Sequence, residues 1–290
     1  MVASLIDMGV AVTRFDFHGQ MRTHGKQIMN ELLRNEFTNG PFDMVVYVPL
    51  EGTEVTEETW QCIEPGTPRV LWLFNDQWRF ESFGREFCWS FEWVVTDDPQ
   101  GPAKYQELGY GDTAVYLPRA CRTAWFGTLP AADRPFDLAF VGQPYGYRGM
   151  MIQKIVSLLP PKSKVLIGNM GAGHFRWPDY VKAYQSAKIV LSLGKASQGD
   201  VWQIKTRDFE ATASGALLLA DSPLVEQVFK PRNEYVPFST PEEAAEQATY
   251  YLKQAAKRKK VAKAGQDRTM REHDYRHRFE ALFNHIQEIR

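Results

Sequence analysis

Residues 203–222 read QIKTRDFEATASGALLLADS, and this stretch carries much of the information about the fold. Its first half mixes charged and small residues and runs up to Gly215, a residue typical of the end of a helix. An apolar run from Ala216 to Ala220 follows directly. The pattern predicts a short helix over 206–214, followed by a buried strand.

Two cations, Lys205 and Arg207, stand at the start of this predicted helix. Because the helix macrodipole favours negative charge at that end, two positive side chains there are unexpected. A bound polyanion would remove the conflict, and the free amides of the first turn together with both cations would suit a diphosphate. The alternative is that both are ordinary solvated surface residues, and local chemistry alone does not choose between the two.

The composition is that of a folded globular protein. The chain has 290 residues, enough for one large or two ordinary domains, with 44% hydrophobic and 24% charged residues. Its net charge of −1 does not indicate a nucleic-acid binder, although a local basic face would be enough for one. Cys62, Cys88 and Cys121 are too far apart and odd in number, which argues against a disulfide scaffold or a compact zinc site.

The sequence carries no sign of membrane insertion or export. No apolar stretch approaches the ~20 residues that a membrane-spanning helix needs. The N-terminus lacks the basic start and apolar core of a signal peptide. We therefore expect a cytoplasmic protein without a membrane span.

Apolar runs alternate with helical patterns along the chain, which predicts an α/β fold with parallel sheets. The pattern opens on a helix, so we expect the first strand of the N-terminal domain to be missing, either from the fold or from this chain. The mixed segment 121–135 is predicted to be a linker. The predicted strands are 10–17, 42–50, 68–74, 93–96, 114–117, 137–141, 164–168, 189–193 and 216–220, and the predicted helices are 1–9, 27–35, 56–63, 102–108, 149–159, 179–185, 206–214, 242–260 and 276–289.

Polar residues that directly follow predicted strands are the first candidates for a ligand site. In open α/β sheets, ligands bind at the carboxyl ends of the strands. These candidates are Asn75, Asp76, Asp97, Asp98, residues 142–148, residues 194–200 and Asp221.

Four blocks of sequence, in this order and spacing, resemble the C-terminal domain of GT-B glycosyltransferases. They resemble the glycosyl transferases group 1, and most nearly the CgeB-like subgroup. The similarity covers 137–288 and is looser in the N-terminal half, where it rests on the segment 72–76. The four blocks are Phe140-Val141-Gly142 with Arg148, residues 205–210 with Gly215, Tyr250-Tyr251-Leu252, and His273-Asp274-Tyr275-Arg276.

The resemblance implies an architecture of two Rossmann-like domains that face each other across a cleft. The N-terminal domain, over 1–125, would bind the acceptor. The domain over 126–270 would bind the nucleotide-sugar donor. A C-terminal helix over 271–290 is expected to pack back on the N-terminal domain.

The resemblance also implies an activity, the transfer of a sugar from a nucleotide-sugar, most simply a UDP-sugar, to an acceptor hydroxyl. Lys205 and Arg207 would bind the diphosphate, and Glu210 would contact the ribose. The family often has an acidic residue eight positions before this Glu, where this chain has Trp202. The expected donor-binding residues are Gly142, Arg148, Lys205, Arg207, Glu210 and Gly215.

His18 and Asp76 are the candidates for catalysis. His18 follows a predicted strand at a position where similar folds keep a catalytic or acceptor-binding His, although a lone His is more often structural. Asp76 would take a proton from the acceptor if the reaction inverts. In a retaining reaction the leaving phosphate can serve as the base. Asn75, Trp78 and His174 are the candidates for acceptor binding.

No cofactor is expected, because the nucleotide-sugar is a co-substrate. No DxD motif is evident, and GT-B folds generally use cationic side chains where other enzymes use a metal, so no metal site is expected either.

The acceptor cannot be read from the sequence. A saccharide or small molecule is one option. A hydroxymethylated DNA base is another, supported only by the run 253–263, which holds six cations and no acid. A non-catalytic nucleotide- or sugar-binding protein is the rival function. A dehydrogenase is disfavoured, because the glycine pattern of a dinucleotide site is absent.

Overall fold

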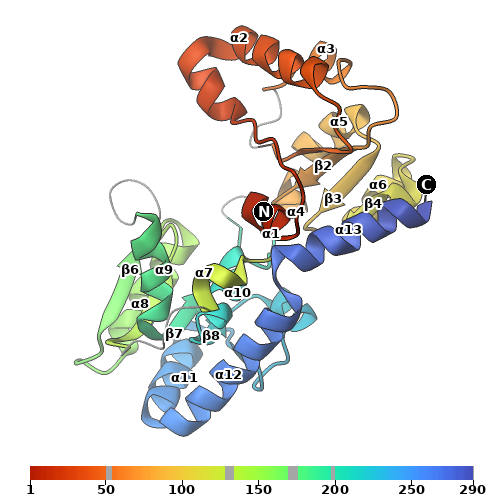
Figure 1. The fold of residues 1–290 in the computed structure, drawn as a ribbon. Coiled ribbons are helices and arrows are strands. Elements are labelled where there is room, and N and C mark those ends of the chain that lie inside the picture. The colour runs from red at the N-terminus through yellow and green to blue at the C-terminus, as the bar shows by residue number, and fades with distance from the viewer. Residues whose placement is uncertain (50–53, 128–133, 169–175, 197–199, 290) are drawn as a thin grey trace. The chain divides into compact units, whose positions relative to one another are not determined.

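The computed structural model describes the whole chain except residues 50–53, 128–133, 169–175, 197–199 and 290. Its contacts divide the chain into two units. The N-terminal unit consists mainly of Ser4–Pro118, together with residues from Ala281 onward. The C-terminal unit consists mainly of Arg119–Glu280. Each unit is built on its own parallel sheet (Figure 1).

The N-terminal sheet has four parallel strands that follow one another in chain order. The central strands are apolar and buried on both faces, as the uninterrupted apolar runs of the sequence predict. Helices α2, α3 and α6 complete a core around Leu71 and Tyr105. The strands are β1 (Val45–Tyr47), β2 (Arg69–Leu73), β3 (Trp93–Thr96) and β4 (Ala114–Tyr116), and the helices are α1 (Val2–Asp7), α2 (Phe17–Asn39), α3 (Glu57–Trp60), α4 (Asp76–Arg79), α5 (Arg85–Phe87) and α6 (Gly101–Glu107), with single turns at Phe80–Gly84, Cys88–Ser90 and Gly111–Thr113.

The strand predicted over 10–17 is wrong. Residues 10–16 pair with no strand in the described part of the chain, and none of them is buried. Asp16 instead begins helix α2, because its Oδ1 accepts a hydrogen bond from the backbone N–H of Gly19 at 3.0 Å. Alternating polar and apolar residues are therefore not enough to make a strand here, and His18 lies in the first turn of a helix.

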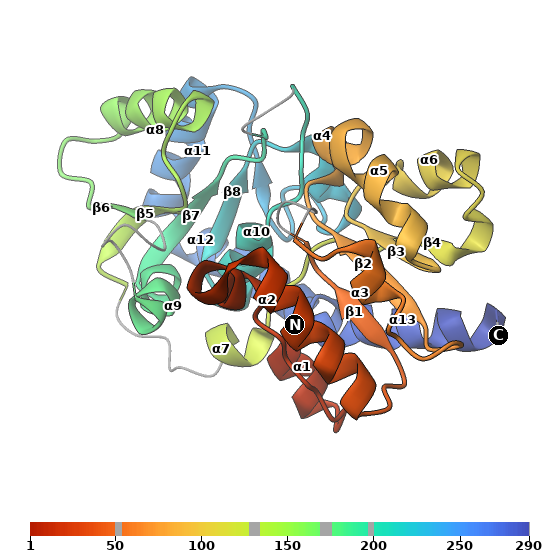
Figure 2. The same cartoon turned by 90° about the horizontal axis from the view of Figure 1, so that it is seen from above.

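The C-terminal sheet has five parallel strands in the order β6-β5-β7-β8-β9. Alternate residues of β5 face opposite sides. Ala139 packs with α9 (Trp177–Gln185) and α10 (Thr206–Ala213), while Phe140 packs with α8 (Tyr147–Leu158) and α11 (Pro241–Lys253). Figure 2 shows α8 and α11 on one side of this sheet and α9 on the other. The strands are β5 (Phe136–Val141), β6 (Val165–Gly168), β7 (Ala187–Ser192), β8 (Leu217–Ala220) and β9 (Val236–Pro237).

The order of these strands changes direction at β5, which is the first in the chain but lies between β6 and β7. In doubly wound folds, the connections on the two sides of such a strand leave in opposite directions. Ligands of doubly wound folds bind at such a switch point. The helices of this unit are α7 (Thr123–Gly127), α8 (Tyr147–Leu158), α9 (Trp177–Gln185), α10 (Thr206–Ala213), α11 (Pro241–Lys253) and α12 (Ala255–Glu272), with one further turn at Pro223–Gln227. Helix α13 (Tyr275–Ile289) begins in this unit, and its residues from Ala281 onward belong to the N-terminal unit.

The long helix predicted over 242–260 is two helices, α11 and α12, which are separated at Gln254. Gln254 has φ −102° and ψ 64°, outside the helical region. The guanidinium of Arg258 donates hydrogen bonds to the carbonyls of Tyr251 and Leu252, which α11 leaves open at its end. The residues on both sides favour helix, so the sequence could not locate the break.

The described part of the predicted linker is packed rather than free. It contains α7, whose Phe126 is buried in the core of the C-terminal unit. Across the described residues, no helix combines the length and the apolar character that crossing a membrane requires.

Candidate functional site

At the start of α10, a side chain of the helix accepts a hydrogen bond from the backbone of the residue before it. Lys205 is the residue before the helix, and its backbone N–H donates to Oδ2 of Asp208 at 2.8 Å. Asp208 is almost fully buried and supplies the negative charge that the helix start favours. The side chains of Lys205 and Arg207 bond elsewhere: the ammonium of Lys205 donates to Oε1 of Gln203, and the guanidinium of Arg207 reaches the end of β5.

Arg207 lies at the carboxyl end of β5, the switch point of the sheet. Its Nε donates to the carbonyl of Val141, and its guanidinium lies 4.4 Å from the centre of the Phe140 ring. A side chain at Gly142 would overlap this guanidinium, and the φ of Gly142 is +153°. Nη1 of Arg207 is buried and has no hydrogen-bond partner among the described residues.

Several cations act on one another around Lys205. Burial, and after it the charges of Arg119, Arg148 and Arg207, lower the pKa of Lys205 to about 7. Arg148, in the first turn of α8, donates to the carbonyl of Lys195 at 3.2 Å, and its own pKa is lowered by burial and by Arg207. Positive charge is thus in excess here, and an anion would stabilise it.

Glu210 lies one helical turn after Arg207 and is buried. Its Oε2 accepts hydrogen bonds from the hydroxyls of Tyr180 at 2.6 Å and Tyr184 at 2.8 Å. Burial nevertheless raises the pKa of Glu210. Both of these bonds reach Oε2, and no hydrogen bond from a described residue reaches Oε1.

The loop after β7 completes the strand-end surface. The backbone N–H of Gly194 donates to Oδ1 of Asp221 at 2.6 Å, and the hydroxyl of Tyr147 donates to its Oδ2 at 3.1 Å. Burial raises the pKa of Asp221 to about 6. Asp221 therefore ties together the loops that follow β7 and β8. Trp202 pairs with Lys195 in this loop, and the ammonium lies 5.8 Å from the centre of the indole.

Five of the six predicted donor-site residues come together in this way: Gly142, Arg148, Lys205, Arg207 and Glu210. Gly215 does not join them. It lies beyond the opposite end of α10, where its φ of +72° ends the helix beside Gln266 and Arg134. It is a structural residue, as its role as a helix stop already indicated.

Asp76 is buried within the N-terminal unit. Its Oδ2 accepts from the hydroxyl of Thr96 at 2.6 Å, and its Oδ1 accepts from Tyr105 at 3.4 Å. Burial raises its pKa to about 6. With 1% of its surface exposed, its carboxylate is not presented to a substrate, so the geometry does not favour the catalytic role predicted for it.

Two predicted acceptor residues flank Asp76. Asn75 has a left-handed φ of 65°, and its backbone N–H donates to Asp97 at 3.0 Å. Trp78 is half-buried, with the guanidinium of Arg79 5.8 Å from its centre. The third predicted residue, His174, lies outside the described residues.

His18 has a partner that the sequence did not reveal. Its Nε2 lies 3.5 Å from Oε1 of Glu54, a buried carboxylate whose Oε2 accepts from the hydroxyl of Tyr47 at 3.0 Å. The side chain of His18 is 24% exposed. The ring therefore has a buried carboxylate near its Nε2 and remains partly accessible, as a proton acceptor requires.

The family model described as "Glycosyl transferase-like" matches residues 131–284, slightly more than half of the chain and most of the C-terminal unit. The chain belongs to this glycosyltransferase family. The predicted enzyme class is thereby confirmed and is favoured over a non-catalytic binding protein. No curated protein matches the sequence.

Solved structures similar to this glycosyltransferase confirm the predicted GT-B fold. HepE of Anabaena in complex with UDP-glucose has a TM-score of 0.59 at 12% identity, with 96% of this chain and 88% of HepE covered. TarM has a TM-score of 0.64 at 9% identity, with 89% and 58% covered. The pneumococcal O-GlcNAc transferase GtfA, in complex with UDP and GlcNAc, has a TM-score of 0.59 at 10% identity, with 90% and 60% covered.

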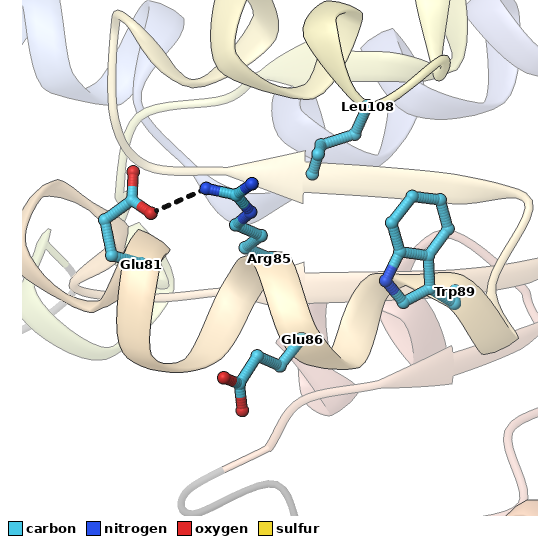
Figure 3. A pocket seen from close by; sticks show the side chains of 5 residues that line it. All are labelled: Glu81, Arg85, Glu86, Trp89 and Leu108. Carbon is cyan, nitrogen blue, oxygen red and sulfur yellow. Dashed lines mark hydrogen bonds and ion pairs between the residues drawn. The ribbon is translucent and has the colours of Figure 1, made fainter.

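An open pocket of ≈ 410 Å³ lies elsewhere on the glycosyltransferase, in its N-terminal unit. In Figure 3, Glu81, Arg85 and Trp89 lie along one helical segment opposite Leu108, and Arg85 binds Glu81 at 3.1 Å. Trp89 is 64% exposed. None of the predicted site residues lines this pocket, so it is separate from the candidate site.

The sequence reasoning missed Tyr180, Tyr184 and Glu54. The two tyrosines are four residues apart and so share one face of α9, a spacing that the sequence does show. Nothing in the sequence indicates that this face meets α10. Glu54 follows residues 50–53 in a polar segment without periodicity, so only the fold brings it to His18.

Proposed function

We propose that this glycosyltransferase uses a UDP-sugar, and that Lys205, Arg207 and Arg148 bind the diphosphate of the donor. The observation that carries this proposal is the buried guanidinium of Arg207, whose Nη1 has no partner among the described residues. Leaving a buried charged donor unsatisfied costs about 1–3 kcal/mol or more. A diphosphate oxygen at the switch point would satisfy it with a charge-assisted hydrogen bond.

The same cations would act in the reaction. When the bond between the sugar and the diphosphate breaks, negative charge grows on the leaving oxygen. Preorganised positive charge in a poorly solvated site stabilises that change more than it stabilises the bound donor. We propose that this charge comes from side chains and that no metal is required.

Glu210 is proposed to accept hydrogen bonds from ribose hydroxyls through Oε1. Its Oε2 is already fixed by Tyr180 and Tyr184, which hold the carboxylate in one orientation. The choice of uridine is supported by HepE, solved with UDP-glucose, and by GtfA, solved with UDP and GlcNAc.

We propose a saccharide or another small molecule as the acceptor rather than a DNA base. Arg258, in the basic run that suggested DNA, interacts with Asp137 near the start of β5. Arg207 binds Val141 at the other end of that strand. Arg258 is thus associated with the amino end of β5 and Arg207 with its carboxyl end, which does not support a nucleic acid bound by both.

His18, which lies beside Glu54, is proposed to take the proton of the acceptor hydroxyl or to bind that hydroxyl. Unlike Asp76, its side chain is partly exposed, and it has a buried carboxylate nearby.

The donor site is tested by calorimetric titration with UDP and UDP-glucose. We expect the wild type to bind both, and Arg207→Ala to weaken binding by roughly 100-fold, about 2–4 kcal/mol for a charged partner of a phosphate. Arg207→Lys, which keeps the charge, should recover part of the loss. Arg85→Ala, which removes an exposed arginine of the other unit, is the matched control. Equal binding by Arg207→Ala and wild type would refute the proposal.

A further inference from the structure

We propose that the exposed basic face of α12 docks on an anionic lipid surface. The basic face consists of Lys257, Lys259, Lys260 and Lys263, and Lys253 lies next to it at the end of α11. The inference goes beyond the proposed function and does not rest on it, because none of these lysines belongs to the candidate donor site. It would give the glycosyltransferase a peripheral, reversible contact with a membrane.

The helical repeat places these lysines on the outer side of α12. Residues three or four positions apart share one side of a helix. Lys259, Lys260 and Lys263 therefore lie together, on the side away from the core, and Lys257 lies at their margin. All four lysines are exposed. The buried residues of α12, which mark its inner side, are Val261, Ala262, Gly265 and Thr269.

These positive charges do not stabilise the helix that carries them. The first turn of α12 holds Lys257 and no acidic residue, although the macrodipole favours negative charge there. Lys259 and Lys263 are one turn apart, where like charges repel each other. Asp267 forms an ion pair with Lys263 and offsets one of the charges. Helix stability therefore does not explain the remaining lysines, whereas a negatively charged partner would.

The choice of cation favours a lipid surface over a nucleic acid. Arg258, the one arginine in the run 253–263, is half-buried and donates hydrogen bonds to the carbonyls of Tyr251 and Leu252. The exposed cations of the run are thus all lysines, which act as point charges, whereas arginine reads phosphates and bases through paired hydrogen bonds. The diffuse negative potential of an anionic bilayer attracts point charges without requiring a set geometry. This charge complementarity identifies the partner.

Two exposed side chains beside the lysines also suit a lipid surface. Tyr250, near the end of α11, is 41% exposed, and its hydroxyl accepts a hydrogen bond from the ammonium of Lys257 at 2.5 Å. Met270 is 40% exposed and lies two helical turns after Lys263, on the same side of α12. Tyrosine is enriched at the headgroup level of membranes, and an apolar side chain can enter the boundary with the acyl chains. Figure 1 shows α11 and α12 side by side, so one surface can present all of these groups.

The test is co-sedimentation of the full-length protein with lipid vesicles at low ionic strength. We expect the wild type to bind vesicles of phosphatidylglycerol and phosphatidylcholine in equal parts, and not vesicles of phosphatidylcholine alone. The triple variant Lys257→Gln, Lys259→Gln, Lys260→Gln should bind the anionic vesicles roughly 100-fold more weakly, about fivefold for each lysine. Arginine at the same three positions keeps the charge and should bind as the wild type does.

A second triple variant is the matched control. Arg14→Gln, Lys26→Gln, Arg85→Gln removes the same net charge from exposed positions of the N-terminal unit and should change vesicle affinity by less than about twofold. Thermal unfolding checks that the α12 variant is folded. Because glutamine removes repulsion among the lysines, this variant should unfold at the same temperature as wild type or higher.

Three results would overturn the proposal. Wild type that does not bind anionic vesicles, or that binds both kinds of vesicle equally, would show that the face does not recognise anionic lipid. An equal loss in the two triple variants would show that net charge, rather than this face, governs binding. Fluorescence anisotropy with a labelled DNA duplex tests the other polyanion: a duplex bound by wild type and lost in the α12 variant, without vesicle binding, would assign the face to a nucleic acid.

Discussion

The two units place charged side chains at the same structural position, after the ends of parallel strands, but they treat those charges differently. In the N-terminal unit, Asp76 accepts hydrogen bonds from Thr96 and Tyr105, and Asp97 accepts from the backbone of the loop after β2. In the C-terminal unit, Lys205 and Arg207 gather with other cations, and a buried N–H group of Arg207 is unpaired among the described residues.

The difference separates a structural cluster from a candidate binding site. The position after a strand brings polar groups together in both units. Where buried charges have no partner in the chain, a bound ligand of opposite charge would stabilise them. The acids of the N-terminal unit hold loops, whereas the cations of the C-terminal unit are suited to hold a ligand.

The largest expected effect is on turnover in Arg207→Ala. Removing the cation that faces the leaving diphosphate should lower kcat/KM by about 100- to 1,000-fold, as for other transition-state donors. UDP released from UDP-glucose, with Arg85→Ala as the control, measures this effect. If Arg207→Ala turned over within threefold of wild type, the cations of the C-terminal unit would not differ in function from the structural acids of the N-terminal unit.

A smaller effect is expected at Glu210. Glu210→Ala should raise the Kd of UDP by roughly 10- to 100-fold, because hydrogen bonds to a charged group are worth about 1.5–3 kcal/mol. Glu210→Gln keeps one acceptor and should lose less. Pyrophosphate binding should be unchanged in both variants, and a loss there would mean that Glu210 acts on the phosphates instead.

A still smaller effect is expected from the tyrosine that holds Glu210. Tyr184→Phe removes one of the two hydrogen bonds to Oε2 and leaves Tyr180 in place. We expect a loss of UDP affinity of a few-fold, about 0.5–1.5 kcal/mol. A loss as large as that of Glu210→Ala would show that Tyr184 does more than position the carboxylate.

Asp76→Asn should leave UDP affinity within about twofold and should instead change the pH dependence of stability. The pKa of Asp76 rises from 3.8 to about 6 on folding, so the folded state binds its proton more tightly than the unfolded state does. The contribution of Asp76 to wild-type stability should therefore be most favourable below pH 4 and fall as the pH rises to about 6, by on the order of 3 kcal/mol.

Thermal unfolding of wild type and Asp76→Asn between pH 4 and pH 7 checks the direction of this pH dependence. Relative to wild type, Asp76→Asn should become more stable as the pH rises through this window. A difference that is constant with pH would contradict the raised pKa, and a large loss of UDP affinity would return Asp76 to the list of functional residues.

Much of the fold could be predicted from the sequence, because a buried parallel strand is an uninterrupted apolar run. The strand 93–96 was predicted to the residue for this reason. Over 10–17, the only evidence for a strand is the alternation of polar and apolar residues. A strand also needs a neighbouring strand to bond to, and a local sequence pattern does not show whether one is present. Gln254 interrupts a helix inside a segment of good helix formers, so only tertiary contacts mark the break.

The candidate site was predictable where its residues follow strands or belong to one motif. Gly142 follows a strand, Lys205, Arg207 and Glu210 belong to one motif, and all four come together. Asp76 follows a strand, yet its carboxylate accepts hydrogen bonds from Thr96 and Tyr105, which no sequence pattern predicts. Partners such as Tyr180, from another helix, could be recognised only in the fold.

The most direct test of the central claim is the proton balance of UDP-glucose binding. At pH 8 a Lys205 with a pKa of about 7 is mostly neutral, and a bound diphosphate would raise that pKa and protonate it. Calorimetric titration at pH 8 in buffers of different ionisation enthalpy should therefore show uptake of up to one proton, absent in Lys205→Gln. Tight binding without proton uptake would contradict the claim that uncompensated cations at the switch point form the donor site.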